Sequence, residues 1–198
     1  MNFEYSDARF LDVIRMIEDY RLDIRTVTMG ISLIGCTRES MVATAQAVYD
    51  RVMERARDLV PVCESIEREL GIPIVNKRIS VSPVALVAAG VEGNPVDIAR
   101  ALDRAAAELG VNFVGGYSAL VEKGGTRSDK RLIYSIPEAL AETDNVCSSV
   151  NVASSRAGIN MNAVAKMGEI VKDAAELTAD RSSIACAKLV VFANAVGD

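Results

Sequence analysis

Segments with the character of β-strands alternate with amphipathic helical segments along this chain, and this alternation restricts the fold more than any other feature. The strand-like runs are 24–33, 74–81, 111–116, 147–152 and 188–194. Between them, apolar residues recur at helical spacing, as from Met41 to Leu59 and from Val164 to Leu177. Strands that alternate with helices predict an α/β fold, with a parallel sheet and right-handed crossovers.

Glycine and proline set the expected helix boundaries. Gly71 and Gly110 follow the last apolar residues of two helical segments, where a left-handed C-cap residue is expected. Pro61 is expected to break the first long helix. Helix starts are expected at Ser6-Asp7, Ser82-Pro83, Asn94-Pro95 and Pro137. The first start would open a helix over 10–17, and the last a short helix through Leu140.

The final strand-like run, 188–194, is almost continuously apolar, which is typical of a strand buried on both faces. Only four residues follow it, so neither a helix to cover it nor a further strand is expected. Such a strand is a liability at a sheet edge, because it exposes unpaired backbone groups. We therefore interpret the chain as about half of a larger barrel. The alternative is an open sheet in which this strand lies centrally.

The composition argues against several kinds of function. The 198 residues include 22 basic and 27 acidic side chains, giving a net charge of −5 and an isoelectric point near 5.0. A nucleic-acid partner would require clustered lysine and arginine, so none is predicted. Histidine is absent, and the chain by itself therefore builds no Ser-His-Asp or Cys-His site and no histidine-ligated zinc. We predict no metal site, and the sequence indicates no particular cofactor.

The N-terminus, the apolar runs and the cysteines together predict a cytoplasmic protein with no membrane partner. Residues Met1–Asp7 are polar and acidic, unlike a secretory signal. The longest apolar stretch, Pro83–Val91, is far shorter than the roughly 18 residues of a membrane span. The cysteines are Cys36, Cys63, Cys147 and Cys186. Their wide spacing, without a Cys-x-x-Cys pair, is typical of reduced thiols.

Polar residues interrupt the second predicted strand. Asn76, Lys77 and Arg78 combine an amide with two cations, which suit a carboxylate or phosphate, and arginine can bind such a group bidentately. Strand alternation places Lys77 on the face opposite Asn76 and Arg78. The alternative is therefore an exposed edge, with alternate residues pointing to solvent.

Gly115, Gly116 and Ser118 are expected to end the third strand in a flexible turn. Such a turn lets backbone N–H groups approach an anion, whereas the alternative is a strand end packed closely against a neighbour. The basic, glycine-rich run 123–131 is the clearest loop signal. It is interpreted as solvated surface, with a mobile lid or an interface loop as the alternative.

The fourth predicted strand is unusually polar. Ser148, Ser149 and Asn151 place hydroxyl and amide groups where partners are needed, which predicts a polar barrel interior or a ligand site. Asn160 extends this cluster, or simply caps the next helix. Cys147 is a candidate nucleophile, although no histidine or cationic cluster lies nearby in the sequence to lower its pKa. Cys36, Cys63 and Cys186, in contrast, are interpreted as small buried apolar residues.

Several longer runs carry a family resemblance over nearly the whole chain. They are 22–33, 71–81, 113–121, 135–137, 142–144, 146–151, 158–164 and 188–195. On these runs the chain resembles uncharacterised protein family 0210, whose members are often called PFL family proteins. The resemblance implies a barrel of ten strands like that of pyruvate formate-lyase, built as two five-stranded halves, and a homodimer. It implies that residues 1–198 are the N-terminal half of this single barrel domain.

Three functions remain open at this point. The first is a metabolic enzyme that binds a small anionic metabolite at the carboxyl ends of the barrel strands, with Cys147 as nucleophile or radical relay. Glycyl radical chemistry is not implied, because the chain has no C-terminal glycine loop and only this one cysteine in a central-strand candidate. The second is a non-catalytic regulatory or sensor subunit working with an ACT-domain partner. The third is an inactive truncated fragment.

Overall fold

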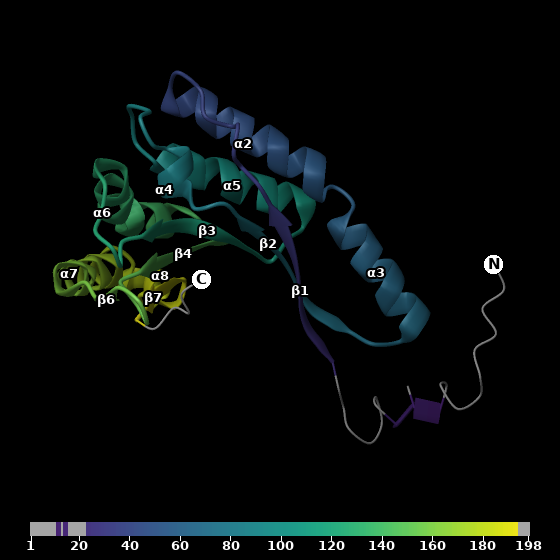
Figure 1. Ribbon diagram of the computed structural model, residues 1–198. Coiled ribbons are helices and arrows are strands. Elements are labelled where there is room, and N and C mark those ends of the chain that lie inside the picture. Colours follow the sequence, from purple (N-terminus) through teal and green to yellow (C-terminus); the bar gives the residue numbers. More distant parts are fainter. Residues whose placement is uncertain (1–10, 13, 16–22, 194–198) are drawn as a thin grey trace.

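The computed structural model describes residues 11–12, 14–15 and 23–193 (Figure 1). Half of the helix predicted over 10–17, together with its expected cap at Ser6-Asp7, lies outside the described residues. None of the described helices is long and apolar enough to cross a membrane.

The main sheet has five parallel strands, which occur along the sheet in the same order as along the chain. They are β1 (Ile24–Ile31), β2 (Ile74–Val81), β3 (Phe113–Leu120), β4 (Val146–Asn151) and β7 (Leu189–Phe192). Each pairs in parallel with the next. The predicted α/β class with a parallel sheet is therefore confirmed.

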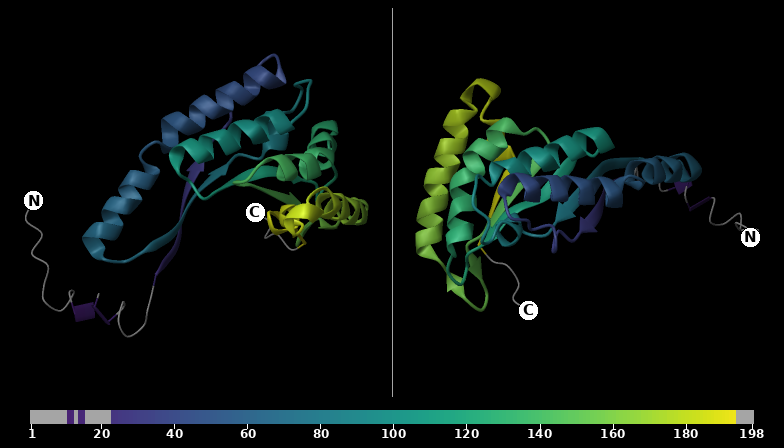
Figure 2. Two further views of the ribbon diagram at one scale, coloured as in Figure 1. Left: turned by 180° about the vertical axis from the view of Figure 1, so that it is seen from behind. Right: turned by 90° about the horizontal axis from the view of Figure 1, so that it is seen from above.

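The helices connect these strands and lie on one side of the sheet (Figures 1 and 2). They are α2 (Met41–Ala56), α3 (Leu59–Leu70), α4 (Val84–Val87), α5 (Val96–Leu109), α6 (Arg127–Glu142), α7 (Met161–Leu177) and α8 (Ile184–Ala187), with a 3-10 turn at Ala179–Arg181. Crossovers of one hand between strands in chain order place every connection on the same face. None of the described helices covers the opposite face of the sheet.

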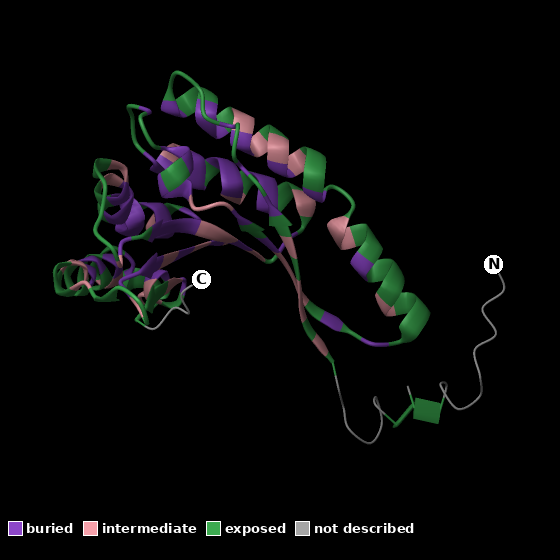
Figure 3. Ribbon diagram, viewed as in Figure 1, coloured by how far each residue is buried: buried purple, intermediate pink, exposed green. Residues whose placement is uncertain are grey.

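The hydrophobic core lies between these helices and the sheet face that they cover (Figure 3). Ile79, Val114 and Val150 come from the strands, and each is almost completely buried. Tyr117 is also buried in this layer, where its hydroxyl lies 2.6 Å from the Ser135 Oγ of α6. The buried phenol has a polar partner, so its burial leaves no unsatisfied oxygen.

Two of the expected helix boundaries are wrong. The break between α2 and α3 falls at 57–58, and Pro61 lies in the first turn of α3. A first-turn proline removes an N–H group that has no helical partner, so the helix tolerates it. Pro137 lies inside α6 and does not start a helix. A capping box of Thr126 and Asp129 starts α6, and it places the second half of the run 123–131 in this helix.

Other boundary signals have mixed outcomes. Gly71 and Gly110 end their helices with φ of 67° and 69°, as predicted. Asn94 accepts a hydrogen bond from the Val96 N–H at the start of α5. Ser82, however, does not cap a helix, because its Oγ accepts from the Leu33 N–H across the sheet. A short hairpin of β5 (Ala153–Ser154) and β6 (Gly158–Ile159) was not predicted.

Gly115 and Gly116 lie inside β3 and not in a turn at its end, which corrects the prediction. The pairing register with β4 shifts between Gly115 and Tyr117, so the extra residue forms a bulge. Gly116 has a φ of 120°, and a Cβ there would lie 2.5 Å from Val81 Cγ2. Close packing is thus the reason for Gly116, whereas a Cβ on Gly115 would meet open space.

Strand β7 lies at the edge of the sheet and not at its centre. The alternative with a central final strand is therefore wrong. The prediction of burial on both faces is also wrong for the described residues. Val190, Val191 and Phe192 are 48%, 38% and 48% exposed. The fold leaves an apolar strand with one unpaired edge.

Replacement of the two β3 glycines tests this packing. We expect Gly116→Ala to lower the free energy of unfolding by about 3 kcal/mol, because it combines a positive φ with a steric clash. Gly115→Ala is the matched control and should change the free energy by less than about 1 kcal/mol. Urea denaturation measures the free energy of unfolding of both variants, and an unchanged m-value shows that the two can be compared with the unaltered chain. Equal stability of the two variants would contradict the bulge geometry.

Candidate functional site

The sheet face that lies opposite the helices collects many of the predicted site residues. Residues paired across parallel strands share a face, and side chains alternate along each strand. One row across this face joins Thr28, Arg78 and Phe113. The next row joins Gly30, Ser80, Gly115 and Cys147. We call this surface the open face.

The predicted site residues are divided between the two faces. Those on the open face are Asn76, Arg78, Gly115, Ser118, Cys147, Ser149 and Asn151. Ser148 faces the helices, where its buried Oγ donates to the Tyr117 carbonyl at 2.7 Å. Gly116 forms the bulge against Val81. Strand alternation therefore decides which polar residues can meet one ligand.

Lys77 does not share a site with Arg78. Its Nζ lies 3.1 Å from Glu67 Oε2 of α3 and also donates to the Ile74 carbonyl. The Ile74 N–H and the Lys77 ammonium hold the pKa of Glu67 below its ordinary value. Lys77 thus ties α3 to β2 on the side of the helices.

Arg78 is the principal cation of the open face. Its guanidinium carbon lies 5.2 Å from the centroid of the Phe113 ring, a cation–π contact. Its Nε is buried without a hydrogen-bond partner, and Arg78 forms no ion pair within the described part of the chain. Gly30 and Gly115 in the next row carry no side chains. The guanidinium therefore has both unused donors and a neighbouring gap.

Cys147 lies beyond Gly115 in the same row as this gap. Burial raises the pKa of the Cys147 thiol, and the positive charges of Lys188 and Arg78 only partly oppose this effect. A raised pKa keeps the group protonated at neutral pH. The thiol can donate a hydrogen bond there, but it is not the activated thiolate that nucleophilic catalysis needs.

Lys188 is a charged residue that the sequence did not single out. It is only 7% exposed, and its Nζ donates to the carbonyls of Leu140 and Thr143 at the end of α6. Burial lowers its pKa. A cation at the negative end of a helix dipole fits a structural role. A lysine at the start of an apolar strand was the only sequence signal for it.

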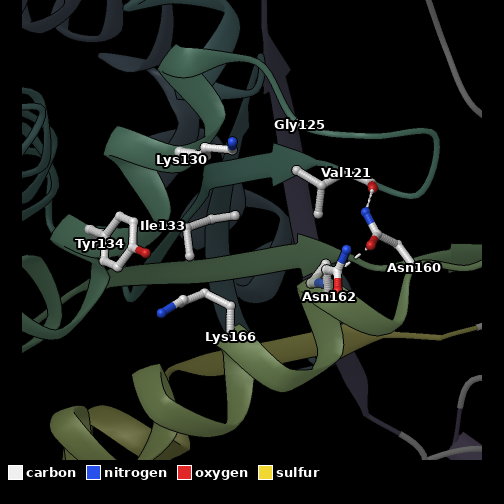
Figure 4. A pocket seen from close by; sticks show the side chains of 9 residues that line it. Val121, Gly125, Lys130, Ile133, Tyr134, Asn160, Asn162 and Lys166 are labelled. Atoms are coloured by element: carbon white, nitrogen blue, oxygen red, sulfur yellow. Dashed lines mark hydrogen bonds between the residues drawn. The ribbon is translucent and has the colours of Figure 1, made fainter.

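The carboxyl edge of the sheet contains two further candidates. Asn151 is buried on the open face, where its Nδ2 donates to Glu122 at 3.2 Å and its Oδ1 has no partner. Asn160 caps α7 by accepting from the Ala163 N–H, as its alternative interpretation stated, and donates to the Val121 carbonyl. Asn160 lines a separate pocket between α6 and α7 (Figure 4).

The arrangement suits ligand binding better than metal binding. The open face offers a guanidinium, hydroxyls, an amide and a protonated thiol, all of which can donate hydrogen bonds. No group of three or more His, Cys, Asp or Glu side chains with metal-binding geometry occurs among the described residues. The fold and site together define an α/β protein with a polar, helix-free face on a parallel sheet.

Residues 15–198 match the sequence model of the family described as Uncharacterised ACR (DUF711), and the chain belongs to this family. It is 75% identical over 193 residues to a UPF0210 protein of Corynebacterium glutamicum, covering 98% of the chain and 42% of that protein. It is 60% identical over 189 residues to a UPF0210 protein of Pelotomaculum thermopropionicum, covering 95% and 42%. The resemblance to family 0210 is thereby confirmed. The chain spans less than half the length of these relatives.

The reactivity of Cys147 tests the electrostatics of the open face. We expect its alkylation rate by iodoacetamide to rise with pH through a midpoint above that of glutathione, because burial favours the thiol. Arg78→Met should move the midpoint higher still by removing an opposing positive charge. Peptide mass spectrometry measures the alkylation rate of Cys147 at each pH. The pH midpoint of this rate reports the thiol pKa, whereas solvent access changes only the size of the rate. A midpoint below about pH 8 would show an activated thiolate instead.

Proposed function

We propose that this protein binds a small anionic metabolite on the open face, with Arg78 as the principal anion ligand. One observation carries the proposal: the Arg78 guanidinium has no ion pair among the described residues, and its Nε is buried without a partner. A buried donor that stays unpaired costs free energy, so a bound acceptor is favoured. Carboxylates and phosphates match the forked donors of arginine.

The surroundings of Arg78 restrict the ligand to a small one. Phe113 holds the guanidinium by its ring face, which leaves the planar N–H groups free to donate. The gap over Gly115 lets an anion approach, and the Cys147 thiol beyond it supplies a weak second donor. Thus Arg78 neutralises the charge, and Cys147 holds a proton beside it. The same proposal includes an enzymatic role, in which the protein acts on the metabolite that it binds.

The open face becomes the interior of a barrel in the complete protein. The single uncovered face, the exposed apolar edge of β7 and the unpartnered Asn151 Oδ1 support this interpretation. The relatives, of which this chain covers 42%, contain enough additional chain for a second half. A ten-stranded barrel like that of pyruvate formate-lyase, with this chain as the N-terminal half, would enclose Arg78.

The remaining expectations belong to the complete protein and are proposals. They are a homodimer, a cytoplasmic location and regulation through an ACT-domain partner. No contact among the described residues favours a regulatory function over metabolite binding, so we propose binding as the primary role.

Substitution of Arg78 tests the proposal. Malonate and inorganic phosphate serve as probes, and malonamide is the uncharged control. We expect Arg78→Met to weaken anion binding by about tenfold or more, because a charge-assisted pair is lost. Arg25→Met on the neighbouring strand is the matched control and should bind as the unaltered chain does. Isothermal titration calorimetry measures the affinities.

A second substitution separates the space from the charge. Gly115→Leu should fill the gap and reduce anion affinity while Arg78 is intact. Unaltered anion binding in Arg78→Met would sink the assignment of Arg78. Equal binding of malonate and malonamide would contradict an anionic ligand.

A further inference from the structure

A pocket of about 280 Å³ lies in the helical layer, away from the open face (Figure 4). It is bounded by the loop that follows β3, by the segment between β6 and α7, and by the first two turns of α6 and of α7. Val121 and Gly125 belong to the first loop, and Asn160 to the second. Loops at the carboxyl ends of parallel strands are common ligand sites in α/β folds. This volume suits a small molecule.

The charged side chains that line the pocket are both lysines. Lys130 comes from α6, and its ammonium group has no ion pair within the described part of the chain. Lys166 comes from α7, pairs with Glu169, and lies with its Nζ 4.9 Å from the centroid of the Tyr134 ring. The carboxylate and the ring thus fix Lys166, whereas Lys130 has an unbalanced positive charge. No acidic residue lines the pocket itself.

The loop on the α7 side of the pocket is held in place by hydrogen bonds. The Asn160 Nδ2 donates to the Val121 carbonyl at 2.7 Å, and its Oδ1 accepts from the Ala163 N–H at 3.2 Å. The first bond joins the two loops, and the second caps α7 (Figure 4). The neighbouring Asn162 also lines the pocket, and its amide forms no hydrogen bond within the described residues. The pocket is therefore preformed and retains an unused amide.

The floor of the pocket is apolar. Val121, Ile133 and Ala163 contribute side chains from the strand end, from α6 and from α7. Val121 and Ile133 are buried, so the packing around them holds their side chains in place. The aliphatic part of a ligand would remain out of water against them. An apolar floor with a cationic rim favours an anion that carries a small aliphatic body over a bare inorganic ion.

We infer that the pocket between α6 and α7 binds a small aliphatic carboxylate, with Lys130 and Asn162 at the carboxylate group and Val121, Ile133 and Ala163 around the aliphatic part. The site is separate from Arg78, because it lies among the helices and not on the open face. It also gives a function to the basic run 123–131, whose Gly125 and Lys130 both line the pocket.

A titration with 3-methylbutanoate tests this inference. Backbone amide resonances of Gly125 and Ala163 in the ¹⁵N-labelled chain should shift saturably. The uncharged 3-methylbutanamide and inorganic phosphate should each bind about tenfold more weakly, because the first lacks the charge and the second lacks the apolar body. Absence of a saturable shift up to about 10 mM carboxylate would overturn the inference. Tighter binding of phosphate would overturn the apolar part of it.

Matched variants locate the binding. Lys130→Met should weaken 3-methylbutanoate about tenfold, whereas Lys123→Met, seven residues earlier on the same basic run, should not. Ala163→Leu should abolish binding by filling the pocket, and an unchanged amide spectrum elsewhere shows that the fold is intact. Arg78→Met should retain binding, which separates this site from the proposed function. Equal affinity of Lys130→Met and the unaltered chain would refute the site.

Discussion

The handedness of the crossovers is the constraint on which the rest of this structure depends. Five parallel strands lie in the sheet in chain order, so right-handed connections place all the helices on the same face. That face is buried under α2, α4, α5 and α6, with α7 packed against α6, while the other face has no helix among the described residues. A single core forms between the two layers. The polar side chains at alternate strand positions are left on the open face.

The two proposed sites follow from this division. Arg78 faces the uncovered side of the sheet, and the lysine pocket lies among the helices on the covered side. The two sites use different cations and suit different ligands, so each can be altered without the other. The Lys77–Glu67 and Lys188 contacts, in contrast, use their charges to hold helices against the sheet. The structural lysines have partners within the protein for their charges, whereas Arg78 and Lys130 form no ion pair among the described residues.

Much of the fold was predictable because its signals are local. The alternation of strands and helices predicts the class and the five strands of the main sheet, and glycine predicts two helix ends. The errors arose where a local signal has two outcomes. Pro61 is tolerated in the first turn of α3. Pro137 is tolerated in the buried interior of α6, where neighbouring residues supply the packing. Gly116 looked like a turn residue, but the approach of Val81 from another strand explains it.

By itself, the sequence determined how polar and apolar residues alternate along each strand, and hence which residues of a strand share a face. Lys77 lies on the face opposite Arg78, and Ser148 lies on the face opposite Cys147 and Ser149. Only the tertiary structure decided which face the helices cover, that Gly115 lies between Arg78 and Cys147, and that Lys130 and Lys166 line one pocket. The physical reason is that alternation is a property of consecutive residues. Burial and charge depend on strands and helices that are far apart in the chain.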